Sequence, residues 1–180
     1  FMERTVEPEL METEDQVNSY DKADFSEGEN NFINQINYYL IKNNISLNEK
    51  ELIVDLGCGP GNITEKLSIK WPKAIVVGID GSQEMIRMAE SNKKNSSNRS
   101  RFKNLSYICA DIKSIKPNEI SAEKNIKLNE KELIVDLGCG PGNISEKLSI
   151  KWPKATVIGI DGSKEMIRIA ELNKKNSSNR

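Results

Sequence analysis

The pattern of apolar and polar residues predicts a strand, a turn and a helix in succession. Residues 52–56 are apolar except for Asp55, which is typical of a strand covered on both faces. Glycines at alternate positions in residues 57–61 then favour a tight turn. Apolar residues recur at helical spacing from Asn62 to Trp71, where the following proline ends the predicted helix.

A second strand and a second helix follow directly. Residues 74–79 form another apolar run, which ends at Asp80. Ser82 is suited to cap a helix that continues through about Glu90. Strands that alternate with helices over short connections predict parallel pairing with right-handed crossovers. The fold class is therefore α/β.

The flanking segments carry weaker patterns. Residues 28–41 have apolar side chains along one face and predict a helix. The Asn- and Ser-rich residues 92–100 predict a loop, and residues 105–110 predict a third strand that ends at Asp111. Residues 112–132 form a connection, with a short helix expected after Pro117.

The same succession of elements recurs 81 residues further along the chain. Residues 48–99 align with residues 129–180, and the peptide LIVDLGCGPGN is identical in the two copies. Solenoid repeats usually diverge further and occur at least three times, so we interpret the repeat as a segmental duplication. The two copies differ by six changes: Thr64 to Ser145, Ile75 to Thr156, Val77 to Ile158, Gln83 to Lys164, Met88 to Ile169 and Ser91 to Leu172.

Composition excludes several classes of function. A formal charge of −1 provides no field that would attract a nucleic acid or an anionic membrane. No apolar run approaches the ~20 residues of a membrane span. Histidine is absent, which excludes catalytic triads built on imidazole. Cys58, Cys109 and Cys139 are an odd, dispersed set of thiols, so we expect a reduced cytoplasmic protein without a metal site.

The glycine turn predicts a ligand site, because backbone N–H groups and the positive end of a helix dipole meet there. Its spacing excludes two common nucleotide loops. The dinucleotide fingerprint requires glycine where Asn62 stands, and no Gly-Lys-Ser/Thr of a Walker loop follows. Asp80, at the end of the neighbouring strand, is a carboxylate that can accept both hydroxyls of a ribose.

This ordered set of motifs resembles the class I, Rossmann-like S-adenosylmethionine-dependent methyltransferases. The resemblance covers roughly residues 20–112 and rests on IVDLGCGPGN, Asp80, SQEMI, and YICADI with its Asp111. It implies a three-layer sandwich with a mostly parallel sheet and S-adenosyl-L-methionine as cofactor. The family's sheet has about seven strands, whereas five are predicted here, so the fold is expected to be incomplete. No catalytic residue can be assigned, because a linker and the second copy replace the segments that supply substrate contacts in that family.

The resemblance also implies roles for individual residues. Asp55 and the glycines would hold the methionine part of the cofactor, Asp80 the ribose and Asp111 the adenine amino group. Met85 would line the adenine, although it could equally be a methionine of the core. Cys58 is interpreted as a turn residue. The cofactor-binding residues expected in the first copy are Asp55, Gly57, Cys58, Gly59, Gly61, Asn62, Asp80, Gly81, Met85, Ala110, Asp111 and Ile112, and a second-copy site would use Asp136, Gly138, Gly140, Gly142 and Asp161.

One arrangement unites the copies in a single sheet of order 3-2-1-1′-2′, where primes mark the second copy. The 21-residue connection exceeds the dozen or so residues that a parallel crossover needs. The two glycine turns would then be adjacent, with Asp136 near the reactive methyl group. Alternatively, the second copy is a half-built unit that frays or forms a homodimer. The expected organisation is a disordered acidic tail at 1–19, a cofactor-binding unit at 20–112, a linker at 113–132 and the duplicated segment at 133–180.

The sequence leaves three functions open. The leading hypothesis is an S-adenosylmethionine-dependent methyltransferase that acts on a small molecule, with neither a nucleic acid nor a membrane as partner. The second is a cofactor-binding remnant that no longer turns over, and the third is a Rossmann-like binder of another nucleoside. The family resemblance favours the first, and the missing substrate half favours the second. We expect one nucleoside site, in the first copy, because the second copy lacks a counterpart of YICADI.

Overall fold

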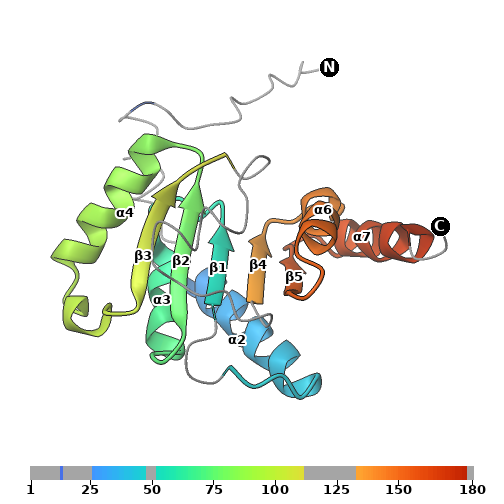
Figure 1. Cartoon of the computed structure of the whole chain (residues 1–180), viewed down its shortest axis with the longest axis horizontal. Coiled ribbons are helices and arrows are strands. Elements are labelled where there is room, and N and C mark those ends of the chain that lie inside the picture. The colour runs from blue at the N-terminus through green and yellow to red at the C-terminus, as the bar shows by residue number, and fades with distance from the viewer. Residues whose placement is uncertain (1–12, 14–25, 48–51, 112–132, 178–180) are drawn as a thin grey trace.

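The computed structural model describes residues 13, 26–47, 52–111 and 133–177, which form an α/β fold (Figure 1). The linker, Ile112 and most of the acidic tail lie outside the described residues, as does the short helix expected after Pro117. In chain order the elements are α2 (Ser26–Lys42), β1 (Leu52–Leu56), α3 (Asn62–Lys70), β2 (Ile75–Asp80), α4 (Gln83–Asn95), the 3-10 turn η1 (Arg99–Arg101), β3 (Leu105–Cys109), β4 (Leu133–Leu137), α6 (Asn143–Lys151), β5 (Thr156–Ile160) and α7 (Lys164–Ser177).

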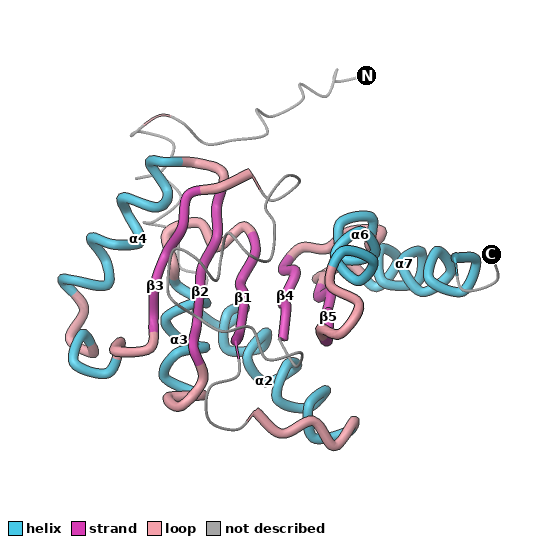
Figure 2. The backbone as a smooth tube through the Cα atoms, in the orientation of Figure 1, coloured by secondary structure: helices cyan, strands magenta, loops and turns pink. Residues whose placement is uncertain are grey.

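All five strands belong to one parallel sheet, in the order β3-β2-β1-β4-β5. Figure 2 shows the strands side by side in this order, with β1 at the centre. The predicted order 3-2-1-1′-2′ is therefore confirmed. Because β4 pairs with β1 of the same chain, the two copies share one sheet and do not form separate units.

The two copies use opposite faces of this sheet. Leu56 of β1 pairs with Asp136 of β4, one residue away from its counterpart Leu137 in the second copy. Side chains alternate between the faces of a strand, so Asp55 points toward α3 whereas its counterpart Asp136 points toward α6. A right-handed crossover that runs in the opposite direction from the centre of the sheet must carry its helix on the opposite face.

Apolar side chains cover both faces, which explains the nearly continuous apolar runs of the strands. On one face, Ile53 and Val76 belong to a buried cluster with the apolar side chains of α2, α3 and α4. On the other face, Val54 and Val77 cluster with Leu148 of α6. The strands whose ends carry the carboxylates are therefore packed between two apolar clusters.

The expected loop at 92–100 was wrong in its first part, because α4 continues to Asn95. Two tertiary contacts hold these added helical residues in place. Lys93 Nζ donates to the carbonyl oxygen of Leu105 at 2.8 Å, and Asn92 Nδ2 donates to that of Pro60 at 3.3 Å. Long-range hydrogen bonds thus extend a helix whose local sequence favours a loop.

The second copy is less well covered than the first. Met85 of α4 is 5% exposed, whereas its counterpart Met166 of α7 is 39% exposed. The reason is that α4 packs against β3, whereas the described residues contain no strand beyond β5 for α7 to cover. In Figure 1, α7 extends away from the body of the sheet.

Tyr107 of β3 supports the first glycine turn from below. Its hydroxyl donates to the carbonyl oxygen of Gly61 at 3.3 Å. Burial raises the pKa of this phenol far above its usual value, so the hydroxyl remains a donor. The ring also lies over Gly78, where an added Cβ would approach ring carbon Cδ1 to 2.7 Å. The space left by Gly78 is therefore required by the tyrosine.

Gly78→Ala is expected to lower the free energy of unfolding by about 1–3 kcal/mol, because the methyl group would overpack against Tyr107. Urea denaturation measures the change. Gly162→Ala is the matched control, since an added Cβ there meets no atom within 4 Å. Equal losses in the two variants would contradict this role of the tyrosine ring.

Candidate functional site

The first glycine turn lies between β1 and α3, at the carboxyl edge of the sheet. Gly57, Gly59 and Gly61 have φ values of 67°, 51° and 90°, in the left-handed region that favours glycine. The N–H groups of Gly57 and Cys58 donate to the carbonyl oxygen of Ile79 at 2.8 and 3.1 Å. The turn is therefore fixed to the end of the neighbouring strand β2.

Asp80 connects this turn to the next helix. Its Oδ2 accepts from the N–H of Gly59 at 2.9 Å, and its Oδ1 accepts from the N–H of Ser82 at 2.8 Å. The Asp80 carboxylate thus lies against the turn. Since each carboxylate oxygen can accept more than one hydrogen bond, the geometry leaves acceptor capacity for the hydroxyls of a ribose.

Asp55 lies beneath the same turn and is completely buried. Its Oδ2 accepts from Thr64 Oγ1 at 2.6 Å, while its Oδ1 has no hydrogen-bond partner among the described residues. Burial raises the pKa of Asp55 to about 7, with a smaller contribution from the nearby Asp80, while the hydrogen bond from Thr64 opposes the rise. An unpartnered buried oxygen of this kind fits a site that receives a cationic group from above.

Cys58 and Met85 are both buried in this structure. Burial raises the pKa of the Cys58 thiol far above its usual value, and the carboxylates of Asp55 and Asp80 raise it further. A thiol that stays protonated is a poor nucleophile, in agreement with its interpretation as a turn residue. Met85 belongs to the buried face of α4, and its N–H donates to Ser82 Oγ at 3.2 Å, so the predicted helix cap is confirmed.

The structure brings α2 to this site, which the sequence analysis missed. Glu29 Oε1 accepts from Asn62 Nδ2 at 3.0 Å, and Glu29 Oε2 pairs with Lys66 Nζ at 3.0 Å. Lys66 also donates to Asn30 Oδ1 at 2.8 Å. These contacts join residues more than 30 positions apart in the sequence. The local feature that could have indicated them is the acidic first turn of α2.

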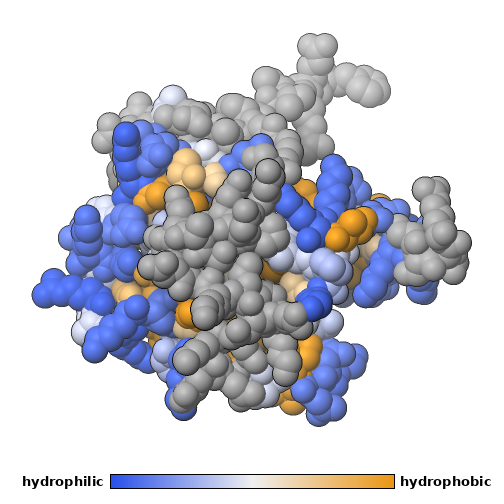
Figure 3. Space-filling model, in the orientation of Figure 1, coloured by the Kyte–Doolittle hydropathy of each residue, from blue (hydrophilic) through white to orange (hydrophobic). Residues whose placement is uncertain are grey.

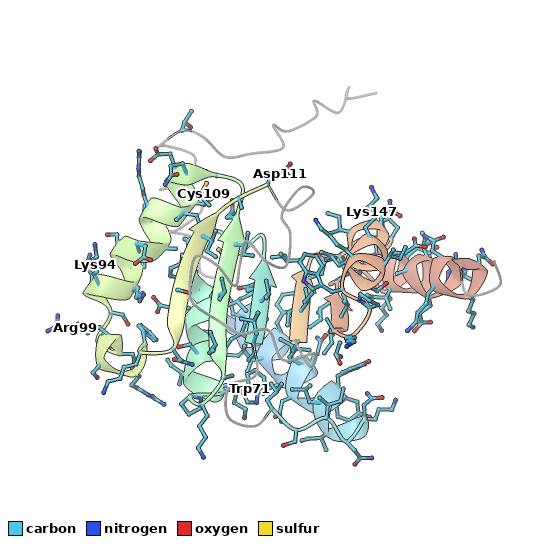
Figure 4. The ribbon with its side chains drawn as sticks, in the orientation of Figure 1. Trp71, Lys94, Arg99, Cys109, Asp111 and Lys147 are labelled. Carbon is cyan, nitrogen blue, oxygen red and sulfur yellow. The ribbon has the colours of Figure 1, made fainter. Side chains whose placement is uncertain are left out.

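The end of β3 lies at the same edge of the sheet as the turn. Asp80 pairs with Cys109 in the sheet, and its carbonyl oxygen accepts from the N–H of Ala110 at 2.9 Å. Asp111 follows and is exposed. In Figure 4, Cys109 and Asp111 lie at this carboxyl end, whereas Trp71 lies at the opposite end of the sheet. The structure therefore gathers three of the predicted carboxylates, those of Asp55, Asp80 and Asp111, around one edge.

The second glycine turn reproduces the backbone geometry of the first. The φ values of its glycines 138, 140 and 142 are 69°, 52° and 82°. Asp161 accepts from the N–H of Gly140 at 2.9 Å and from the N–H of Ser163 at 2.7 Å. The same local sequence therefore folds into the same turn in both copies, although the helices that follow the two turns cover opposite faces of the sheet.

The surroundings of the second turn differ. Asp136 is buried and its Oδ2 accepts from Ser145 Oγ at 2.6 Å, so this carboxylate lies beneath its own turn and does not project from the edge as a free base. Among the residues that the structure describes, no tyrosine takes the place of Tyr107 at this turn; an added Cβ on Gly142 would instead meet Ala170 at 3.0 Å. The expectation that Asp136 approaches the reactive methyl group gains no support from this geometry.

The part of the chain that the structure describes contains neither a candidate metal site nor a candidate membrane-spanning helix. Within residues 26–47, 52–111 and 133–177, no three His, Cys, Asp or Glu side chains cluster in a way that could hold a metal ion. No helix in these ranges has the length and apolar character needed to cross a membrane.

Both copies match one protein family. Residues 53–124 and residues 134–179 each match the model of the methyltransferase domain, and together these segments make up more than half of the chain. The chain belongs to this methyltransferase-domain family. Each match begins within the first strand of a copy and includes the glycine turn and the helix that follow it.

Relatives of this methyltransferase-domain chain include trans-aconitate 2-methyltransferases. The protein of Escherichia coli O45:K1 (strain S88 / ExPEC) is 40% identical over 75 residues, which are 42% of this chain and 26% of that protein. The protein of Azoarcus sp. (strain BH72) is 53% identical over 45 residues, which are 25% of this chain and 18% of that protein. The similarity thus covers about a quarter or less of these relatives.

Solved methyltransferases share the fold. The plantazolicin methyltransferase BpumL in complex with SAH has a TM-score of 0.52 at 25% identity, with 86% of this chain and 55% of that chain covered. The plantazolicin methyltransferase BamL, in complex with a triazolic desmethylPZN analog and SAH, has a TM-score of 0.52 at 21% identity, with 79% of this chain and 47% of that chain covered. The methyltransferase-domain chain therefore corresponds to about half of each structure.

Asp55→Asn is expected to stabilise the ligand-free chain at high pH. The pKa of about 7 in the folded chain lies above the ordinary value of 3.8, so the wild type loses stability as the pH rises from the lower value to the higher. The variant escapes this loss. Its advantage in the free energy of unfolding should grow by about 2 kcal/mol between pH 5 and pH 8, as measured by urea denaturation.

Glu171→Gln serves as the control, because it removes a carboxylate from the exposed surface of α7. Its stability difference from the wild type should not change with pH in this range. A difference for Asp55→Asn that is equally independent of pH would show that the buried carboxyl group does not titrate as described.

Proposed function

We propose that the chain binds S-adenosyl-L-methionine at the first glycine turn and transfers its methyl group to a small molecule. One observation carries the proposal: the Asp80 carboxylate lies against the N–H of Gly59, where a nucleoside resting on the turn would present its ribose. The unpartnered Oδ1 of buried Asp55 supports it, since the methionine part of the cofactor is cationic.

The order of the strands gives the cofactor a direction. Asp111 follows β3, Asp80 ends β2, and the turn that begins at Gly57 follows β1. With the roles implied by the resemblance, the adenine would lie toward β3, the ribose at β2 and the methionine part at β1. When bound, the cofactor supplies an electrophilic methyl group. The protein's own contribution is to hold that group in place, since positioning alone can provide much of the rate enhancement.

A second candidate is a cofactor-binding protein without turnover. It is favoured by Asp136 of β4, because this carboxylate is buried and accepts a hydrogen bond from Ser145. The similarity covers 18–26% of the trans-aconitate 2-methyltransferases named above. The methyl acceptor of those relatives therefore does not transfer to this chain by similarity.

Asp80→Ala is expected to weaken the binding of S-adenosylhomocysteine by at least about tenfold, because the ribose loses its acceptor and the turn loses the bond at Gly59. Calorimetric titration measures the dissociation constant. Asp161→Ala is the matched control from the second copy, where the corresponding bond to Gly140 is the same length. Equal losses would mean two working sites, and no loss in Asp80→Ala would refute the proposed site.

We also propose that both copies form one domain, and that the chain is cytoplasmic and self-associates along the second copy. The free thiols Cys58, Cys109 and Cys139 support a reducing compartment. For self-association, the support is the distribution of apolar surface, part of which Figure 3 shows beside α6 and α7. In the second copy, the large apolar side chains exposed in the described residues lie on α6 and α7 and are Ile144, Ile150, Met166 and Leu172.

Leu172→Ser is expected to weaken this self-association several-fold, because Leu172 is 45% exposed and serine stands at the corresponding position 91 of the first copy. Sedimentation equilibrium measures the dissociation constant of the dimer. Lys94→Ala, on the exposed end of α4, is the control and should leave that constant unchanged. A wild-type chain that stays monomeric at high concentration would exclude the proposed homodimer.

A further inference from the structure

An open cavity of about 560 Å³ lies between α2 and the second copy. One wall of the cavity is the face of α2 opposite to the core side chains of that helix. The other side is the last half of β5 and the start of α7. The lining residues are Asn31, Asn34, Gln35, Tyr38, Tyr39, Ile158, Gly159, Ile160, Asp161 and Ile167.

The cavity lies on the side to which the proposed cofactor points its methionine part. Adenine, ribose and methionine follow β3, β2 and β1, and the next strands in the same direction are β4 and β5. With strands spaced about 4.8 Å apart, β5 is roughly 10 Å from β1. In addition, α2 contacts α3 through Glu29 and lines the cavity from Asn31 onward, so one helix joins the turn to the cavity.

The lining has the chemistry of a site for an uncharged ligand. It contains three carboxamides, two phenols and the half-buried Ile167, whereas Ile158 and Ile160 are each only 6% exposed, and no Lys or Arg occurs among these described lining residues. The carboxamides of Asn31, Asn34 and Gln35 make no side-chain hydrogen bond to another described residue, so their donors and acceptors remain available. The one charged lining group is the carboxylate of Asp161, which would repel an anion.

We propose that this cavity binds the methyl acceptor, and that the acceptor is an uncharged, hydrogen-bonding small molecule and not a polycarboxylate. The proposal rests on the proposed function. A carboxylate-bearing acceptor would lose its hydration without gaining a cationic partner, whereas a neutral molecule can exchange water for the amides of α2 and cover the exposed rings of Tyr38 and Tyr39. The acceptor class thus differs from the tricarboxylate in the names of the relatives.

The test uses two probes that differ in charge, trans-aconitate and its neutral trimethyl ester, titrated by calorimetry into the full chain in the presence of S-adenosylhomocysteine. The wild type should bind the ester at least about tenfold more tightly than the acid. Asn34→Ala should weaken ester binding about fivefold. Gln35→Lys places a cation in the cavity and should strengthen acid binding about tenfold. Asn95→Lys, the matched control on the exposed end of α4, should change neither value.

Three results would overturn the proposal: acid binding as tight as ester binding in the wild type, a ratio that Gln35→Lys leaves unchanged, or no binding of either probe. Each protein is also titrated with S-adenosylhomocysteine alone. Failure of that titration, with the ester preference and its reversal by Gln35→Lys retained, would refute the proposed cofactor and leave the cavity's preference for a neutral ligand established.

Discussion

The site depends on one carboxylate that joins two backbone segments. Asp80 ends β2, which lies between β1 and β3 in the sheet, and it accepts from the N–H of Gly59 in the turn and the N–H of Ser82 at the cap of α4. The turn, the strand and the helix are therefore positioned by the same two oxygens. Charged acceptors make the stronger hydrogen bonds of a protein, so this pair fixes the shape of the turn before any ligand is present.

The second copy shows how much of this arrangement is local. Asp161 makes the same two hydrogen bonds as Asp80, at nearly the same distances, although its copy lies on the opposite face of the sheet. The environment does not repeat, because β3 supports only the first turn, through Tyr107. The first copy thus has a supported turn with an adjacent third strand, and the second copy has the turn alone. This difference supports the proposal that the nucleoside binds in the first copy.

The first turn and the cavity beside α2 differ in their polar groups. Asp55 has a buried carboxylate oxygen without a hydrogen-bond partner among the described residues. A cationic ligand at the first turn would interact favourably with it. The cavity two strands away offers amides, phenols and isoleucines, with Asp161 as its only charged group among the described lining residues. A cofactor of net positive charge next to a neutral acceptor is a consistent pairing, because neither ligand adds net negative charge to a region that already holds carboxylates.

The sequence by itself determined the local elements and their order. The apolar runs predicted β1 and β2, the glycines predicted the turn, and Ser82 predicted the cap of α4, because each depends on neighbours within a few residues. A buried parallel sheet with right-handed crossovers allows few strand orders. The order predicted from the sequence is the one that the structure has.

Only the tertiary structure decided the remaining features. The extension of α4 to Asn95 depends on the bond from Lys93 to Leu105, and the approach of α2 depends on Glu29 and Asn62, which lie 33 positions apart. The one-residue offset between β1 and β4 turns Asp136 away from the face of Asp55. These outcomes arise when chain segments meet in space, so periodicity and spacing along a single segment carry no record of them.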